Sequence, residues 1–277
     1  MVKITTLIEN KKGEHLGLEE EHGLSFFIEV DNKKLIFDTG KTDAFLKNAE
    51  KLQINLSEID EVILSHGHYD HTGGVKSLVK KLGKSFSLYA HEDIFVKKYK
   101  VEKESMKFLG NDFDKEWLVN NNVKVNSVKE DVTKVTDKIY IVTNFDRVTK
   151  FEKNNPIYKV ENVNDYIIDD FHDEVSVVIQ TAKGLVVVLG CSHPGIVNIL
   201  KTIIKRFGNN IHTIIGGTHL VGATLERIKE TIEFINENDI KCIGVSHCTG
   251  LAAVLEFEKT LGDRYFYNCT GMILDFD

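Results

Sequence analysis

Between positions 62 and 71 the chain reads VILSHGHYDH, a strand-length apolar run that passes directly into a histidine-rich loop. Residues 62–64 predict a buried strand, and apolar residues at helical spacing return over 75–82. The side chains of the loop that can bind a metal are His66, His68, Asp70 and His71. A loop between a strand and a helix is held by a rigid scaffold, which makes it a typical place for functional groups.

The loop has the residue types and the spacing of a metal site. Alternate residues of an extended segment point the same way, so His66 and His68 can bind one ion. Asp70 and His71 are offset by the turn and can reach a second ion. Imidazole and carboxylate ligands without thiolates favour Zn, Fe or Mn, and two such ions about 3.5–4 Å apart hold a hydroxide as nucleophile. A solvated polar loop is the weaker interpretation, because four metal-binding groups fall within six residues.

Three more histidines lie just beyond the carboxyl ends of predicted strands in the second half of the chain. They are His193 after residues 185–189, His219 after 211–215, and His247 after 240–245. The loop at 66–71 has too few ligands for two ions, so distant segments must supply the others. His193 and His247 are the best candidates for this role.

The remaining histidines and a small basic patch are interpreted without a metal. His91 ends the predicted strand 86–90 and either faces the same rim as the site or is incidental. His172 lies among acidic residues, so it is expected to be solvated. The histidines without companion ligands are His15, His22 and His212. The lysines at positions 97, 98 and 100 are interpreted as a solvated face.

The composition limits which classes of protein this chain can belong to. The chain has 277 residues, of which 42% are hydrophobic and 28% charged, enough for one large domain with a substantial core. Lys+Arg 35 against Asp+Glu 42 gives a net charge of −7, so neither nucleic acid nor a membrane surface is an expected partner. No apolar run is long enough for a bilayer and no secretory signal precedes the first strand, which predicts a cytoplasmic protein. Four scattered cysteines without a CxxC pair fit reduced thiols.

Strands and helices alternate in both halves of the chain, which predicts an α/β fold. The pattern weakens from about 92 to 170, where only residues 123–125 and 139–142 indicate clear strands. Pro194 is expected to open the helix 196–207. We therefore expect a single domain over residues 1–277, with an irregular insertion or cap at about 92–170.

The histidine loop matches in full the His-x-His-x-Asp-His signature of the metallo-β-lactamase superfamily, which this chain resembles. The resemblance implies an αββα sandwich with metal ions at the edge between two sheets. Asp38 in the sequence FDTG (37–40) matches the early aspartate of that family, which orients the loop by hydrogen bonds instead of binding metal.

Three segments resemble one branch of the superfamily more specifically. They are LGCSHPGIVN (189–198), GGTHL (216–220) and SHCTG (246–250). These are similar to motifs of the archaeal methanopterin-pathway synthases, which join a dihydropterin pyrophosphate to a ribofuranosylaminobenzene phosphate, and of their bacterial relatives of unassigned activity. A shared fold and motif do not fix the substrate.

The resemblance implies two sets of metal ligands. One ion is held by His66, His68 and His193, and the other by Asp70, His71 and His247. The main hypothesis is a hydrolase of phosphoesters or other esters that uses a hydroxide at this dinuclear site, with two divalent ions, zinc first and iron or manganese as alternatives. The alternative is the synthase reaction on two organic substrates, and a non-catalytic or redox metal protein ranks below both.

Two residues at this predicted site have open roles. Cys191 stands where hydrolases of the superfamily commonly have a bridging Asp, so it is either a thiolate ligand or a small buried side chain. His219 is expected to contact the substrate or a developing oxyanion, and Asp70 to orient the hydroxide as well as to bind metal. The expected substrate is a small anion, and the sequence leaves open whether the chain forms a homo-oligomer.

Overall fold

The computed structural model describes residues 1–14, 17–163, 165–208 and 210–276, so His15 lies outside the described residues. The chain divides into two compact units. Unit 1 consists of Met1–Lys129, Asn154–Asp173 and Cys269–Phe276, and unit 2 of Glu130–Lys153 and Glu174–Asn268. The single domain expected from the sequence stays a prediction.

Unit 1 is built on a seven-stranded sheet in the order β18-β1-β2-β3-β4-β5-β8. Its strands are β1 (Val2–Ile8), β2 (Ser25–Val30), β3 (Lys33–Phe37), β4 (Glu61–Ile63), β5 (Phe86–His91), β8 (Val123–Val128) and β18 (Ile273–Asp275). The strands from β18 to β3 are antiparallel, and those from β3 to β8 are parallel. The tight β2–β3 turn has Asp31 at φ 53°, the left-handed conformation that a two-residue hairpin loop requires.

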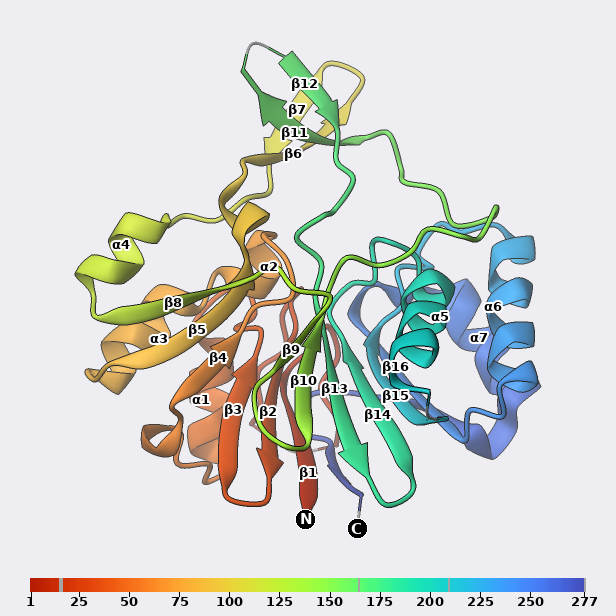
Figure 1. The fold of residues 1–277 in the computed structure, drawn as a ribbon, viewed down its shortest axis with the longest axis horizontal. Helices are drawn as coiled ribbons and strands as arrows, with labels where there is room; N and C mark the ends of the chain where they lie inside the picture. The colour runs from red at the N-terminus through yellow and green to blue at the C-terminus, as the bar shows by residue number, and fades with distance from the viewer. Residues whose placement is uncertain (15–16, 164, 209, 277) are drawn as a thin grey trace. The chain divides into compact units, whose positions relative to one another are not determined.

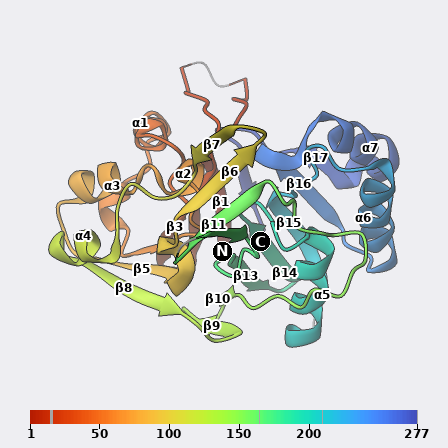
Figure 2. The ribbon, with the colours of Figure 1, turned by 90° about the horizontal axis from the view of Figure 1, so that it is seen from above.

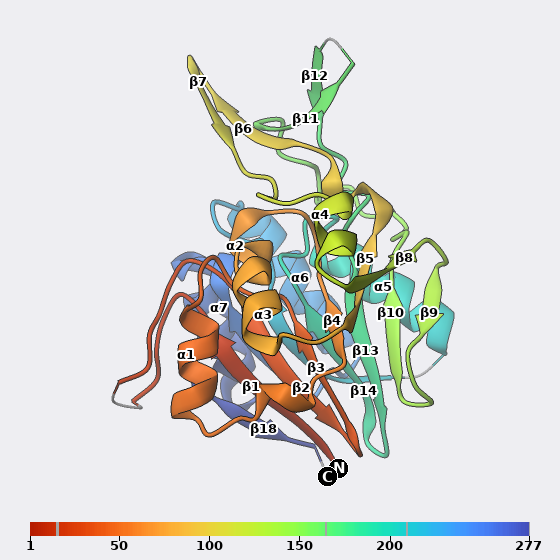
Figure 3. The ribbon, with the colours of Figure 1, turned by 90° about the vertical axis from the view of Figure 1, so that its left-hand side faces the viewer.

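Helices of unit 1 cover one face of this sheet, as Figure 3 shows for α1 and α3. The helical segments are α1 (Ala44–Lys51), η1 (Leu56–Glu58), α2 (Tyr69–Thr72), α3 (Val75–Leu82), η2 (Glu92–Phe95) and α4 (Lys115–Asn120). Phe45 of α1, Leu78 of α3 and Leu118 of α4 are buried in one cluster with apolar side chains of the sheet. The apolar spacing that predicted α1 and α3 is therefore the side of each helix that packs on the strands.

A smaller four-stranded sheet, in the order β12-β11-β6-β7, also belongs to unit 1. Its strands are β6 (Lys98–Glu102), β7 (Ser105–Phe108), β11 (Tyr158–Asn162) and β12 (Asp165–Ile168). Figures 1 and 3 show both hairpins standing clear of the seven-stranded sheet of the same unit. These strands were not apparent in the sequence, because β7 and β12 are exposed along their whole length and lack the alternation of a half-buried strand.

Unit 2 has a second seven-stranded sheet, in the order β17-β16-β15-β14-β13-β10-β9. Its strands are β9 (Val132–Lys134), β10 (Ile139–Val142), β13 (Ser176–Thr181), β14 (Gly184–Leu189), β15 (Ile211–Gly217), β16 (Cys242–Ser246) and β17 (Tyr265–Tyr267). Its helical segments are α5 (Ile196–Phe207), α6 (Leu225–Glu237), η3 (His247–Thr249), α7 (Leu251–Leu261) and η4 (Gly262–Arg264). Apolar residues of α5, α6 and α7 form one core with the sheet, and Figure 2 shows α6 and α7 side by side.

Each unit thus has an antiparallel half and a parallel half, and the α/β class predicted from the sequence is confirmed. Most residues singled out for chemistry follow the carboxyl ends of parallel strands: β3 and β4 in unit 1, and β14, β15 and β16 in unit 2. This is the edge at which open α/β sheets bind ligands. Across the described ranges, no helix combines the length and the apolar character needed to span a membrane.

Two local expectations were wrong. Pro194 does not open α5, since the helix begins at Ile196 after the cap residue Gly195. The first N–H groups of the helix, those of Val197 and Asn198, instead donate to the buried carboxylate of Glu152 at 2.8 Å each. Lys98 is not part of a solvated face: it begins strand β6 and is 2% exposed, and its ammonium donates to the buried carboxylates of Asp169 and Asp173.

Candidate functional site

Asp38 follows β3 and holds the histidine loop that follows β4. The two strands are parallel neighbours, with Phe37 opposite Ile63, so their carboxyl ends lie side by side. One oxygen of the fully buried Asp38 carboxylate accepts from the Ser65 N–H at 2.7 Å. The other accepts from Ser65 Oγ at 2.7 Å and from His71 Nδ1 at 2.6 Å. Asp38 therefore fixes both the backbone of the loop and the ring of His71.

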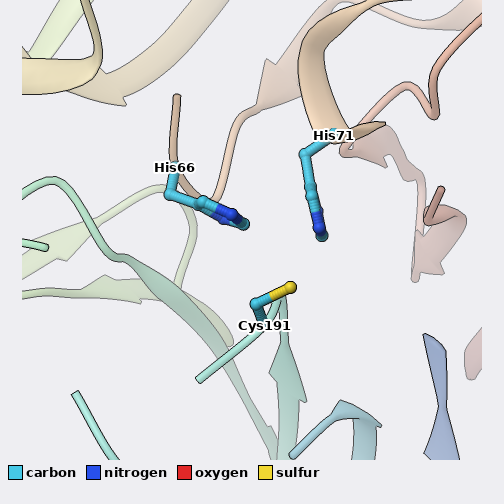
Figure 4. Close-up of side chains that lie close together, drawn as sticks. All are labelled: His66, His71 and Cys191. Atoms are coloured by element: carbon cyan, nitrogen blue, oxygen red, sulfur yellow. The ribbon is translucent and has the colours of Figure 1, made fainter. Parts of the chain in front are cut away.

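These hydrogen bonds set the tautomers of two histidines. A carboxylate only accepts, so His71 carries its proton on Nδ1 and a lone pair on Nε2. The Ser65 hydroxyl donates to Asp38, and its oxygen, 2.9 Å from His66 Nδ1, accepts from that nitrogen. His66 thus also presents a lone pair at Nε2, and partners of this kind are what orient metal-binding histidines. Figure 4 shows the two rings turned toward one another, with centroids 4.2 Å apart.

His68 completes a buried group of three imidazoles in unit 1. Its Nδ1 lies 3.0 Å from His66 Nε2, close to the spacing of about 3.3 Å that two nitrogens have on one tetrahedral zinc ion. Burial lowers the pKa of His68 to about 3. Burial and the neighbouring His71 and His68 rings hold the pKa of His66 well below its usual value. Both rings are neutral near pH 7, which is the form that binds a metal ion.

The segment 154–173 supports this loop from within the same unit. The Gly67 N–H donates to Asp173 Oδ2 at 2.7 Å, and a Cβ at position 67 would lie 2.4 Å from the carbonyl oxygen of Ile94. Asp173 also binds the buried ammonium of Lys98 at 2.9 Å, and Asp169 binds it at 2.7 Å. Burial acts to lower the pKa of Lys98, but the two carboxylates outweigh burial and raise it. The loop is therefore held by the carboxylate of Asp173, which also forms a buried ion pair with Lys98.

Asp70 has a partner that sequence reasoning missed. Its Oδ2 lies 3.1 Å from Nε2 of His22, a half-exposed histidine that was set aside for lack of companion ligands. His22 lies before β2, and the sequence between it and Asp70 carries no pattern that would link them. The backbone oxygen of Asp70 accepts from the Leu24 N–H at 3.2 Å, so the segment around His22 is fastened to the loop.

In unit 2 the predicted residues lie at the ends of three adjacent parallel strands. Cys191 and His193 follow β14, His219 follows β15, and His247 follows β16. Ser192, His219 and His247 all have positive φ, at 64°, 49° and 53°, so the chain turns sharply at each strand end. The buried carboxylate of Glu174 accepts from the Ser192 N–H at 3.0 Å and from the His193 N–H at 3.4 Å.

Unit 2 brings two pairs of these side chains together. The rings of His193 and His219 have centroids 4.2 Å apart. Cys191, which Figure 4 also draws, is 3% exposed, and its carbonyl oxygen accepts from the Cys248 thiol at 3.4 Å. Burial alone raises the pKa of the Cys248 thiol, but interactions with the side chains of Cys191 and His219 and with the nearby His247 outweigh it and hold that pKa well below its usual value. Cys248 is a second residue that sequence reasoning did not place at the site.

Two other histidines have positions that do not involve a metal. His91 is the cap of η2, and its Nδ1 accepts from the Asp93 N–H at 3.2 Å. His172 is exposed, as expected from its acidic neighbours. Each ligand set implied by the resemblance draws residues from both units, so the two sets stay a prediction. Within unit 1, the neutral imidazoles of His66 and His68, with nitrogens 3.0 Å apart, are of a type that binds a divalent metal. Within unit 2, Cys191, His219 and Cys248 bring two thiols and an imidazole within 4.8 Å of one another.

Comparison with known proteins agrees with this geometry. The family model of the metallo-beta-lactamase superfamily matches residues 18–149. The crystal structure of Tm1679, a metal-dependent hydrolase of the beta-lactamase superfamily, is 30% identical, with a TM-score of 0.87 over 100% of both chains. The chain belongs to the metallo-beta-lactamase superfamily. It has the fold of that superfamily, and the sequence prediction of an enzyme is confirmed.

Two further proteins are similar to this chain, one in sequence and one in fold. The 7,8-dihydropterin-6-methyl-4-(beta-D-ribofuranosyl)-aminobenzene-5'-phosphate synthase of Methanocaldococcus jannaschii is 35% identical over 99% of this chain and 97% of its own length. The metallo-beta-lactamase fold protein YhfI of Bacillus subtilis shares the fold at 14% identity, with a TM-score of 0.62 over 99% of this chain and 98% of its own.

Proposed function

We propose that this protein is a metal-dependent synthase that joins a dihydropterin pyrophosphate to a ribofuranosylaminobenzene phosphate. The observation that carries the proposal is the 35% identity with the M. jannaschii synthase over nearly the full length of both proteins. The similarity covers 99% of this chain, so it extends over the loops between the strands and helices as well as over the scaffold. The motif segments at 189–198, 216–220 and 246–250, which resemble the same branch, contain the strand ends of unit 2.

The proposed metal ligands are the residues that the superfamily resemblance implies. They are His66, His68 and His193 for one divalent ion, and Asp70, His71 and His247 for the other. Zinc is the first choice for both ions, with iron and manganese as alternatives. When bound, such ions stabilise the negative charge of a leaving pyrophosphate. A small anionic substrate needs this local positive charge, because the chain as a whole has a net charge of −7.

The side chains of this protein have distinct tasks in the proposed reaction. Asp38 holds His71 in the tautomer that binds metal, and the contact from Gly67 to Asp173 holds the loop. We assign His219, whose ring packs beside that of His193, to contact with an anionic oxygen of the substrate. In the reaction the amine nitrogen of the ribofuranosylaminobenzene phosphate forms a bond to the methylene carbon of the dihydropterin, the bond from that carbon to the pyrophosphate oxygen breaks, and the amine loses a proton.

A hydrolase is the second candidate, and one observation favours it: the relative with a TM-score of 0.87 is a metal-dependent hydrolase. Phosphoesters or other esters would then react with water alone. The two functions differ in the number of organic substrates that are needed.

The test supplies the metal-loaded protein with the dihydropterin pyrophosphate and the ribofuranosylaminobenzene phosphate, singly and together, and follows products by mass spectrometry. A synthase gives the condensed product and one pyrophosphate per product, only when both substrates are present. Release of phosphate or pyrophosphate from the dihydropterin substrate alone, with no condensed product, would overturn the synthase and support the hydrolase. His68→Ala should abolish turnover, and His172→Ala, which changes an exposed histidine of the same unit, should not.

A further inference from the structure

We infer that unit 2 binds a soft divalent cation of the zinc class through Cys191, His219 and Cys248. The two sulfur atoms and one ring nitrogen of His219 all lie within 4.8 Å of one another. This trio is not one of the ligand sets proposed above, and all three residues belong to unit 2. The inference therefore does not depend on the synthase reaction.

The topology of the sheet places these residues together. β14, β15 and β16 are consecutive parallel neighbours, with Leu189 opposite Gly216 and Gly217 opposite Ser246. Each strand contributes one member of the trio within a few residues of its carboxyl end. Residues far apart in the sequence thus converge on one point at the edge of a rigid sheet, which gives a binding site its fixed geometry.

Gly217 leaves the space in which the sulfur atom of Cys248 lies. A Cβ at this position would be 2.7 Å from Cys248 Sγ and 2.5 Å from the carbonyl oxygen of Gly190. No larger residue can occupy position 217 while the Cys248 thiol keeps its place. The backbone N–H of His219 donates to Cys248 Sγ at 3.3 Å, a contact of the kind that also stabilises a metal-bound thiolate.

The donor set selects the class of cation. Two thiols and an imidazole prefer zinc and other soft ions to magnesium or calcium, which take oxygen ligands. A tetrahedral zinc ion holds its sulfur and nitrogen ligands about 3.3–3.8 Å apart, so atoms within 4.8 Å of one another need to close by no more than about 1.5 Å. Binding releases the two thiol protons to solvent and leaves a neutral complex of one Zn²⁺ and two thiolates.

An ion at this position would act on the neighbouring histidine. A cation bound to one ring nitrogen of His219 leaves the N–H of the other nitrogen to contact the substrate oxygen. The ring of His219 lies 4.2 Å from the ring of His193, so a ligand bond to His219 also restricts His193. The ion would join the ends of three strands that are otherwise connected there by contacts such as the 2.7 Å hydrogen bond from Ser192 Oγ to the Gly217 carbonyl.

The experiment is a titration of the full-length, reduced protein with Cd²⁺, followed by the ultraviolet thiolate-to-cadmium charge-transfer band. We expect a band that saturates and whose cadmium affinity falls at least tenfold in Cys248→Ser. Cys242→Ser and Cys269→Ser are the matched controls, because these half-buried thiols lie outside the trio, and they should titrate like the wild type. A band that survives Cys248→Ser, or no band in the wild type, would overturn the inference.

A second measurement on the wild type covers the case in which Cys248→Ser fails to fold. Alkylation by iodoacetamide, mapped by peptide mass spectrometry, should be slowed by Zn²⁺ at Cys191 and Cys248 together and unchanged at Cys242 and Cys269. Protection of Cys191 alone, or a disulfide between Cys191 and Cys248 in place of protection, would also contradict the site.

Discussion

Asp38→Asn tests how the histidine loop is held. The carboxylate accepts three hydrogen bonds, from Ser65 N, Ser65 Oγ and His71 Nδ1, and is fully buried. An asparagine whose Oδ1 keeps the Ser65 N–H turns its NH₂ toward the other two groups. His71 must then accept at Nδ1 and carry its proton on Nε2, the nitrogen proposed to bind metal.

The expected loss of metal affinity follows from the loss of these contacts. Loss of a partner that orients a metal-binding histidine costs about 10–100-fold in metal affinity, which corresponds to about 1.4–2.8 kcal/mol. Competition with a chromophoric chelator measures that affinity, and circular dichroism checks the fold. Asp60→Asn, which changes an exposed aspartate of the same unit paired with Lys84, is the control and should bind like the wild type. An Asp38→Asn protein that folds and binds metal within twofold of the wild type would refute this role of Asp38.

Three further substitutions test contacts that stabilise the structure within each unit. Lys98→Met leaves Asp169 and Asp173 buried without their ammonium and should lower the free energy of unfolding in urea by about 3–5 kcal/mol. Because the pKa of Lys98 is raised, its contribution to stability is complete below about pH 10.4 and is lost as the pH rises through the raised pKa. Lys98→Met should not show this loss at high pH. Gly67→Ala places a Cβ 2.4 Å from the Ile94 oxygen and should lower the melting temperature and the metal content together, whereas a normal metal content would argue against a fixed loop. Glu152→Ala removes the acceptor for two N–H groups of α5 and should cost about 1–2 kcal/mol, against no change for the exposed Glu130→Ala.

The elements of the fold and site that could be predicted from the sequence are those set by residues close together in the chain. The apolar run before His66 and the spacing of the four metal-binding groups are contained in ten residues, so strand, loop and helix followed from periodicity alone. The positions of His193, His219 and His247 at strand ends followed in the same way, because short β-branched runs are reliable signs of buried strands.

The parts that it missed depend on contacts between distant residues. His22 meets Asp70, and Cys248 meets Cys191, without any pattern that connects the partners along the chain. Lys98 was misjudged because a charged strand gives no sign of which face it buries, and only the carboxylates of Asp169 and Asp173 make its burial favourable.

The metal content of purified wild-type protein beside His68→Ala and His172→Ala, determined by elemental mass spectrometry, decides whether the histidine loop binds metal. His68→Ala should contain at least one ion per chain fewer than the wild type, because one of three buried imidazoles of the loop is gone. His172→Ala should match the wild type, since His172 is exposed and outside this group. Equal metal in the wild type and His68→Ala, or a wild type that neither contains nor takes up metal, would contradict metal binding by the loop.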